Sequence, residues 1–350
     1  MAQSRHRVVL HIGLHKTGTR YLQREVFRGL DPQAFVVNPE PLWTAIRQAV
    51  RNPDNGGLAD RARTHAQAWR DSNDMRTLII SEPHISGDMY GNHHDHEKNA
   101  ALMRELFPEA RIVYFVRNQA DWLQSAYRQQ LVKGGSVPIH VFLNHYDGAF
   151  QDRPHRWVYG ARTVEALNQC FLRIHRAYTR YFGPAAVALF RQEDLRHRAP
   201  AVRARLAEIL NLDALPTPPE ERAQNRSYSA LAIRLFHPGT GKGYRKPSPA
   251  DIGRPARTWR SRLRLLFRLR RLLIQHGFDR LVYVDWDLLA VHGLREQIDA
   301  HYAAENEEIA RIAADVLEVG CDTRAAPAHE NHGSQVWHGQ SVSATAWGGR

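Results

Sequence analysis

The sequence has few cysteines and no long apolar run, and each scarcity excludes a class of protein. Only Cys170 and Cys321 occur among the 350 residues, so neither a disulfide scaffold nor a cysteine zinc site is expected. No uncharged stretch approaches the roughly 20 residues of a membrane-spanning helix, and the first apolar run is too short for a signal peptide. We therefore expect a folded protein without a transmembrane segment, located in the cytoplasm.

Lysine is also scarce, although the chain is strongly basic. The formal net charge is +12, and all but five of the 48 cationic side chains are arginines. The planar fork of arginine donors suits phosphate, sulfate and carboxylate groups. The excess predicts an anionic partner, although a genome that favours arginine codons would produce the same composition.

Short apolar runs separated by helix-length segments indicate the fold class. Glycine or polar residues end these runs, and amphipathic stretches lie between them. This alternation predicts an α/β protein with a mostly parallel sheet flanked by helices on both faces. The predicted strands are 7–12, Thr77–Ser81, Arg111–Val116 and Ala185–Phe190, and two of the predicted helices are Asn99–Phe107 and Asn118–Val132.

The loop after the first predicted strand is the most informative segment. It reads Gly13-Leu14-His15-Lys16-Thr17-Gly18-Thr19, between a strand and a helix start. A loop with two glycines at this place directs successive backbone N–H groups at one oxyanion, which the helix dipole also favours. The alternative is an ordinary glycine turn.

The position of the lysine separates this loop from that of a nucleotide triphosphatase. The P-loop pattern GxxxxGK[ST] has its lysine after the second glycine, whereas Lys16 precedes Gly18 and Thr19 follows it. This order places Lys16 near the outer, bridging end of a bound group. Thr17, Gly18 and Thr19 would then hold the inner phosphate.

The segment His11–Gln23 resembles the 5′-phosphosulfate loop of sulfotransferases that use 3′-phosphoadenosine 5′-phosphosulfate (PAPS), especially their bacterial branch, where a His-Lys-Thr-Gly-Thr core is usual. The resemblance implies that His15 and Lys16 belong to the donor site. It also matches Tyr21 to the aromatic residue that stacks on adenine, although a tyrosine here is as often part of the core. Arg20 departs from the usual threonine, and an arginine can also serve an anion.

A second segment resembles the 3′-phosphate site of the same family. That site uses an arginine after a later strand and a serine eight residues on, and here these are Arg117 and Ser125. Arg117 follows a predicted strand, at the carboxyl end where α/β sheets bind ligands. Ser125 lies two turns into the next predicted helix, so both side chains can reach one phosphate.

Sulfuryl transfer also needs a group that accepts the proton of the acceptor. The family's base commonly follows the strand that carries the next catalytic loop, which here ends in Ser81-Glu82-Pro83-His84. Glu82 is the first choice and His84 the second, with Lys16 stabilising charge on the bridging oxygen. A salt-bridged carboxylate and a surface histidine are the structural alternatives.

Two other signals carry less weight. The residues of His93–Glu97 are consecutive instead of spaced along one helix face, and no second group of metal ligands is evident elsewhere in the sequence. We therefore expect no metal site. The segment 254–274 has an arginine stripe opposite a leucine stripe, which predicts an amphipathic basic helix. It is either a core helix with a charged back or a surface for a polyanion or a membrane, so peripheral membrane contact through 254–274 stays open.

The resemblance implies a PAPS-dependent sulfotransferase-like domain over 1–324, an α/β fold with a P-loop NTPase-like parallel sheet flanked by helices on both faces. We expect a loop or lid and the basic helix at 213–275 and a flexible tail at 325–350. The expected acceptor offers a hydroxyl or an amine, with a carbohydrate or another anionic molecule as the first guess. No metal and no stable nucleic-acid partner are expected. The alternatives are an ATP-dependent phosphotransferase or NTPase of the same fold and a catalytically silent member that binds polyanions.

Overall fold

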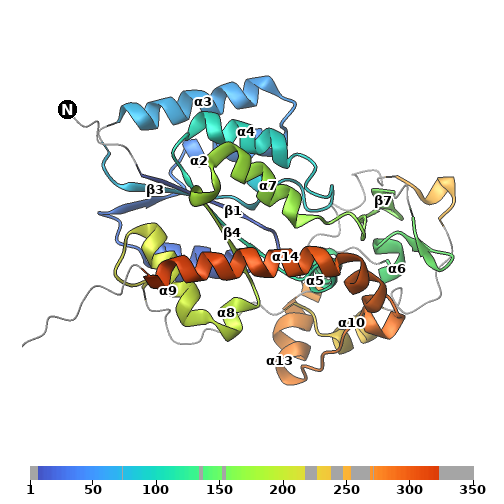
Figure 1. Cartoon of the computed structure of the whole chain (residues 1–350). Coiled ribbons are helices and arrows are strands. Elements are labelled where there is room, and N and C mark those ends of the chain that lie inside the picture. The colour runs from blue at the N-terminus through green and yellow to red at the C-terminus, as the bar shows by residue number, and fades with distance from the viewer. Residues whose placement is uncertain are drawn as a thin grey trace, which may run out of the picture.

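A five-stranded parallel sheet forms the centre of the molecule (Figure 1). The computed structural model describes residues 7–72, 74–133, 137–151, 155–216, 227–237, 247–253, 269–270 and 272–322. The strand order is β2-β3-β1-β4-β9, and all neighbouring pairs run parallel. The predicted sheet is confirmed. Its strands are β1 (Val8–Gly13), β2 (Phe35–Val37), β3 (Thr77–Ser81), β4 (Arg111–Val116) and β9 (Val187–Arg191).

The strands are apolar on both sides because both faces of the sheet are covered. In β4, Ile112 and Tyr114 lie in the larger core cluster, whereas Val113 and Phe115 lie in the smaller cluster on the opposite face. Successive side chains of a strand point to opposite faces, so a continuous apolar run is needed when both faces are buried. This requirement explains why the strands were recognisable in the sequence.

Helices lie on both sides of the sheet (Figure 1). Helices α2, α3, α4 and α7 cover one face, and the helical run that follows β1 packs with α9 on the other. The long helix α14 runs along the edge strand β9 and contacts both α9 and α5. The bounds are α1 (Thr19–Tyr21), η1 (Leu22–Val26), η2 (Phe27–Gly29), α2 (Leu42–Arg51), α3 (Gly56–Asp71), η3 (Pro83–Ser86), α4 (His96–Leu106), α5 (Gln119–Val132), α7 (Phe171–Phe182), η4 (Pro184–Ala186), α8 (Asp194–His197), α9 (Ala199–Leu210) and α14 (Arg295–Asp322).

Smaller elements gather beside one end of the sheet, where β7 and α10 are labelled in Figure 1. Two short antiparallel hairpins, β5–β6 and β7–β8, belong to this group. The bounds are α6 (Ile139–Phe142), β5 (His145–Tyr146), β6 (Ala149–Phe150), β7 (Trp157–Val158), β8 (Ala161–Arg162), α10 (Ala230–Phe236), η6 (Pro249–Asp251), η7 (Leu273–Phe278), α13 (Asp279–Leu281) and η8 (Ala290–His292).

Several predicted segments fall outside the described residues. They include the whole tail at 325–350, most of the basic segment 254–274 and much of the loop or lid region 213–275. Within the described part, none of the helices has the length and apolar character needed to cross a bilayer.

Candidate functional site

The turn after β1 has the predicted strand, glycine loop and helix start. The Leu14 carbonyl oxygen accepts hydrogen bonds from the hydroxyls of Thr17 (2.9 Å) and Thr19 (2.8 Å). Gly18 precedes α1 with φ 96°, a left-handed conformation that glycine adopts without strain. The Tyr21 N–H donates to the Gly18 oxygen over 2.8 Å and closes the first helical turn.

The backbone of this turn offers hydrogen-bond donors. Among the described residues, no hydrogen bond uses the backbone N–H of Thr17, Gly18 or Thr19 as its donor. Because both threonine hydroxyls already donate to the Leu14 oxygen, the backbone amides are the donors left for a ligand. Such amides at the start of a helical segment suit an anion.

The neighbouring strand and its helix hold the turn in place. The Leu14 N–H donates to the Phe115 oxygen of β4 over 3.0 Å. From α5, the Trp122 indole N–H donates to the His15 oxygen over 2.7 Å. The loop is therefore attached to the two elements that carry Arg117 and Ser125.

Lys16 carries a charge that no described carboxylate neutralises. No Asp or Glu of the described residues lies within ion-pair distance of its ammonium group. Removal from water lowers the pKa of Lys16 to about 8, and repulsion from Arg20 and Arg117 adds to this effect. A bound anion would relieve this repulsion.

Arg117 and Ser125 lie where the sequence predicts them. Arg117 directly follows β4, its side chain is 21% exposed, and its nearest carboxylate is Asp121, 3.9 Å away. Burial lowers the pKa of Arg117, against the opposing influence of Asp121 and Glu193. Ser125 lies within α5, and its side-chain hydroxyl makes no hydrogen bond with another described residue. Since β1 and β4 are neighbours, Lys16 and Arg117 follow adjacent strand ends.

Arg20 and Tyr21, the second and third residues of α1, differ in their surroundings. Arg20 is exposed. Tyr21 packs against the smaller core cluster, and its hydroxyl accepts a hydrogen bond from Arg203 over 3.3 Å. These contacts give Tyr21 a packing role, and its predicted stacking on adenine stays a prediction.

Glu82 is a buried carboxylate whose polar neighbours are His84 and Arg47. It is 4% exposed, and its Oε1 accepts from His84 Nδ1 over 2.7 Å and from the His84 backbone N–H over 3.2 Å. Its Oε2 lies 3.5 Å from Arg47 Nε. Pro83 packs directly against Gly13, so Glu82 and His84 lie beside the loop that follows β1.

A second arginine sets the tautomer of His84. Arg51 Nη2 lies 3.0 Å from His84 Nε2, and an arginine can only donate, so Nε2 accepts. Nδ1 of the neutral ring therefore carries the proton and donates it to Glu82. The His84 ring also meets the His15 ring edge to face, with centroids 4.5 Å apart.

His15 adds an uncharged histidine to this cluster. Burial lowers its pKa well below the usual range, and the neighbouring cations Lys133 and Arg51 lower it further. Its Nδ1 is buried without a hydrogen-bond partner. The ring can therefore lie among cations without adding to their repulsion.

The histidines of His93–Glu97 do not gather into a metal site. In the described part of the chain, no three His, Cys, Asp or Glu side chains are placed to hold an ion. His94 and His96 bond through Nδ1 to the backbone oxygens of Gly91 and His93. His93 itself is buried between Trp122 and Phe171.

Sequence reasoning missed Arg51, Lys133 and Trp122, which all take part in the surroundings of the loop. Trp122 and Lys133 lie on or beside the predicted helix Asn118–Val132, so a search of that helix for cations and indoles would have found them. Arg51 ends α2, a helix that was not predicted. Only the packing of α2 against η3 brings Arg51 to His84.

Comparisons with known proteins find similarity among solved structures alone. No family model matches the chain, and neither does any curated protein. Among solved structures, it is similar to a sulfotransferase from Alicyclobacillus acidocaldarius. The two share 15% identity over 67% of this chain and 91% of that chain, with a TM-score of 0.42.

Proposed function

We propose that the chain transfers the sulfuryl group of PAPS to a hydroxyl or an amine of an acceptor. The observation that carries the proposal is the pair of cations, Lys16 and Arg117, at adjacent strand ends and close enough for Arg117 to lower the pKa of Lys16. A ligand with two separated anionic groups would neutralise both. PAPS has a 5′-phosphosulfate and a 3′-phosphate.

The residues present suit such a donor. The unused amides of Thr17, Gly18 and Thr19 would bind the 5′-phosphate, and Lys16 would lie beside the bridging oxygen. Arg117 with the hydroxyl of Ser125 would bind the 3′-phosphate. Each of these groups is a donor or a cation that the described residues leave without a full set of partners.

The transfer is an in-line displacement that depends on positioning and charge stabilisation. A bond forms between the acceptor oxygen or nitrogen and sulfur, and the bond from sulfur to the 5′-phosphate oxygen breaks. The electron pair stays with the leaving adenosine 3′,5′-bisphosphate, where Lys16 would stabilise it. The acceptor proton would pass to Glu82 directly, or to His84 Nε2 once Arg51 withdraws, with Glu82 stabilising the imidazolium.

Calorimetry with two nucleotides tests the proposal. We expect adenosine 3′,5′-bisphosphate to bind without a metal and ATP with magnesium to bind at least tenfold more weakly. Preferred binding of magnesium and ATP would overturn the proposal in favour of a phosphotransferase or NTPase. Bisphosphate binding without sulfuryl transfer from labelled PAPS to a broad acceptor panel would instead indicate a catalytically silent protein.

A further inference from the structure

A cluster of cationic and aromatic side chains near the loop has no role in the donor site described above. Tyr90 lies in the turn after η3, Arg162 ends β8 and Lys133 follows α5. The Arg162 guanidinium carbon is 4.5 Å from the centroid of the Tyr90 ring, and the Lys133 ammonium nitrogen is 5.8 Å from it. Three segments that are distant in sequence therefore meet at one aromatic ring.

The cluster keeps a positive charge. Arg162 forms an ion pair with Asp88, which neutralises one of the two cations. Lys133 is exposed and has no described carboxylate within ion-pair distance. One ammonium group therefore remains available to an anionic ligand.

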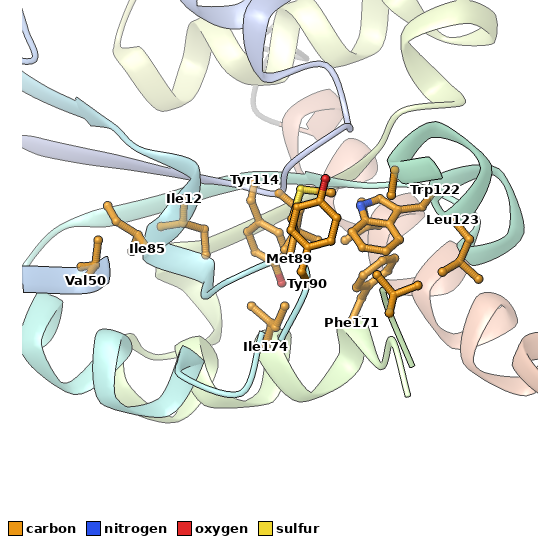
Figure 2. Packing of buried hydrophobic residues seen from close by; sticks show 14 of the residues in the cluster. Ile12, Val50, Ile85, Met89, Tyr90, Tyr114, Trp122, Leu123, Phe171 and Ile174 are labelled. Atoms are coloured by element: carbon orange, nitrogen blue, oxygen red, sulfur yellow. The ribbon is translucent and has the colours of Figure 1, made fainter. Parts of the chain in front are cut away.

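Tyr90 supplies an unused hydrogen-bond donor. The residue is 6% exposed, and its hydroxyl oxygen is buried without a partner. Burial raises the pKa of Tyr90 to about 12, so the hydroxyl keeps its proton at neutral pH. Figure 2 shows Tyr90 among the buried residues of the larger core cluster, which also includes Met89 and Trp122.

The cluster lies within electrostatic reach of the loop. The charge of Lys133 contributes to lowering the pKa of both Lys16 and His15. The pKa of Lys133 is itself lowered by its partial removal from water and by repulsion from Arg162 and Arg51. Tyr90 follows η3, and Pro83 of η3 packs against Gly13, so the chain that carries Tyr90 leaves the loop on the side of Glu82 and His84.

We propose that Lys133, Arg162 and Tyr90 bind an anionic group, a carboxylate or a phosphate, that the acceptor carries beside its reacting hydroxyl. This inference rests on the proposed function, in which the loop and Arg117 already account for the anionic groups of the donor. An ammonium, a guanidinium and a buried hydroxyl are the donors that an oxyanion prefers. A neutral acceptor would leave the Tyr90 hydroxyl and the Lys133 charge unused.

Calorimetry on the protein saturated with adenosine 3′,5′-bisphosphate tests this subsite. The probes are p-nitrophenyl β-D-glucuronide, the 6-phosphate of p-nitrophenyl β-D-glucoside and the neutral glucoside, which share one scaffold. We expect one of the two anionic probes to bind at least tenfold more tightly than the glucoside. The better of the two identifies the anion as a carboxylate or a phosphate, and equal affinities for all three would overturn the inference.

Matched variants assign the preference to the cluster. Lys133→Met should bring the anionic and neutral probes within twofold of each other, and Lys133→Arg should restore most of the difference. Lys98→Met is the control, because Lys98 is an exposed residue of α4 that pairs with Asp54. Retention of the preference in Lys133→Met, with wild-type helix content by circular dichroism, would place the anion elsewhere and overturn the inference.

The two proposals fail separately. If the bisphosphate binds and no probe shows an anion preference, the acceptor inference fails and the sulfuryl-transfer proposal stands. If the bisphosphate itself does not bind, the first titration overturns the proposed function, and the assignment of this cluster to an acceptor falls with it.

Discussion

Two regions at the carboxyl end of the same parallel sheet differ in how their charges are balanced. After β1 and β4, Lys16 has no described carboxylate partner and Arg117 has only one at 3.9 Å. After β3, the carboxylate of Glu82 accepts from His84 and lies 3.5 Å from Arg47. The first region has cations that a bound anion would neutralise, whereas the carboxylate of the second already has partners within the protein.

This difference suggests separate tasks. Cations that the fold leaves unpaired reduce stability until a ligand neutralises them, so they indicate binding. A carboxylate held by a histidine and an arginine is oriented, and it must loosen one of these contacts before it accepts a proton. The following changes test this division, beginning with the one that should have the largest effect.

Removing the Lys16 ammonium should lower activity without lowering the stability of the fold. We expect Lys16→Met to lower kcat for sulfuryl transfer by about 100-fold to 1000-fold, as for the loss of a group that stabilises transition-state charge. Because burial and repulsion lower the pKa of Lys16 in the folded protein, the variant should unfold at the same temperature or higher. A radiolabelled transfer assay and thermal unfolding check both points, and a large loss of stability would contradict this interpretation.

The base assignment can be tested by comparing two substitutions after β3. We expect Glu82→Gln to lower kcat about 100-fold and His84→Asn about tenfold, because Glu82 is the first choice as base. Binding of adenosine 3′,5′-bisphosphate should stay unchanged in both variants. A larger loss in His84→Asn than in Glu82→Gln would instead identify His84 as the group that takes the proton.

Arg117→Ala should act mainly on donor affinity. We expect its dissociation constant for adenosine 3′,5′-bisphosphate to rise about 30-fold, corresponding to about 2 kcal/mol for a charged hydrogen-bonded contact. Adenosine 5′-monophosphate, which lacks the 3′-phosphate, serves as the matched ligand and should lose far less. Unchanged bisphosphate affinity in the variant would remove the proposed 3′-phosphate contact.

A smaller effect concerns the pH dependence of stability. Burial lowers the pKa of His93 to about 3, so the unfolded chain binds one more proton than the folded chain between about pH 6.5 and pH 3. The free energy of unfolding should therefore fall with decreasing pH in this window, by about 1.4 kcal/mol per pH unit for this residue. Asparagine tolerates the positive φ of His93, so His93→Asn should reduce that slope, as urea titrations at several pH values would show. An unchanged slope would contradict a neutral, buried His93.

The strands and the loop were predictable because their signals are local. Each of the four predicted strands is a continuous apolar run, and the Gly13–Thr19 turn carries its glycines and lysine within seven residues. The strand β2 was missed because three residues are too few for a periodic pattern. Helix α2 was missed as well, and with it the two arginines that contact Glu82 and His84.

The sequence alone determined the parallel sheet and the position of Lys16 ahead of Gly18, because the apolar runs and the loop motif are patterns of neighbouring residues. Tertiary packing decided which nitrogen of His84 carries the proton, because Arg51 reaches that ring from 33 residues away. Packing also decided that Lys133 and Arg162 share the ring of Tyr90. Such contacts depend on distances between segments that only the folded chain brings together.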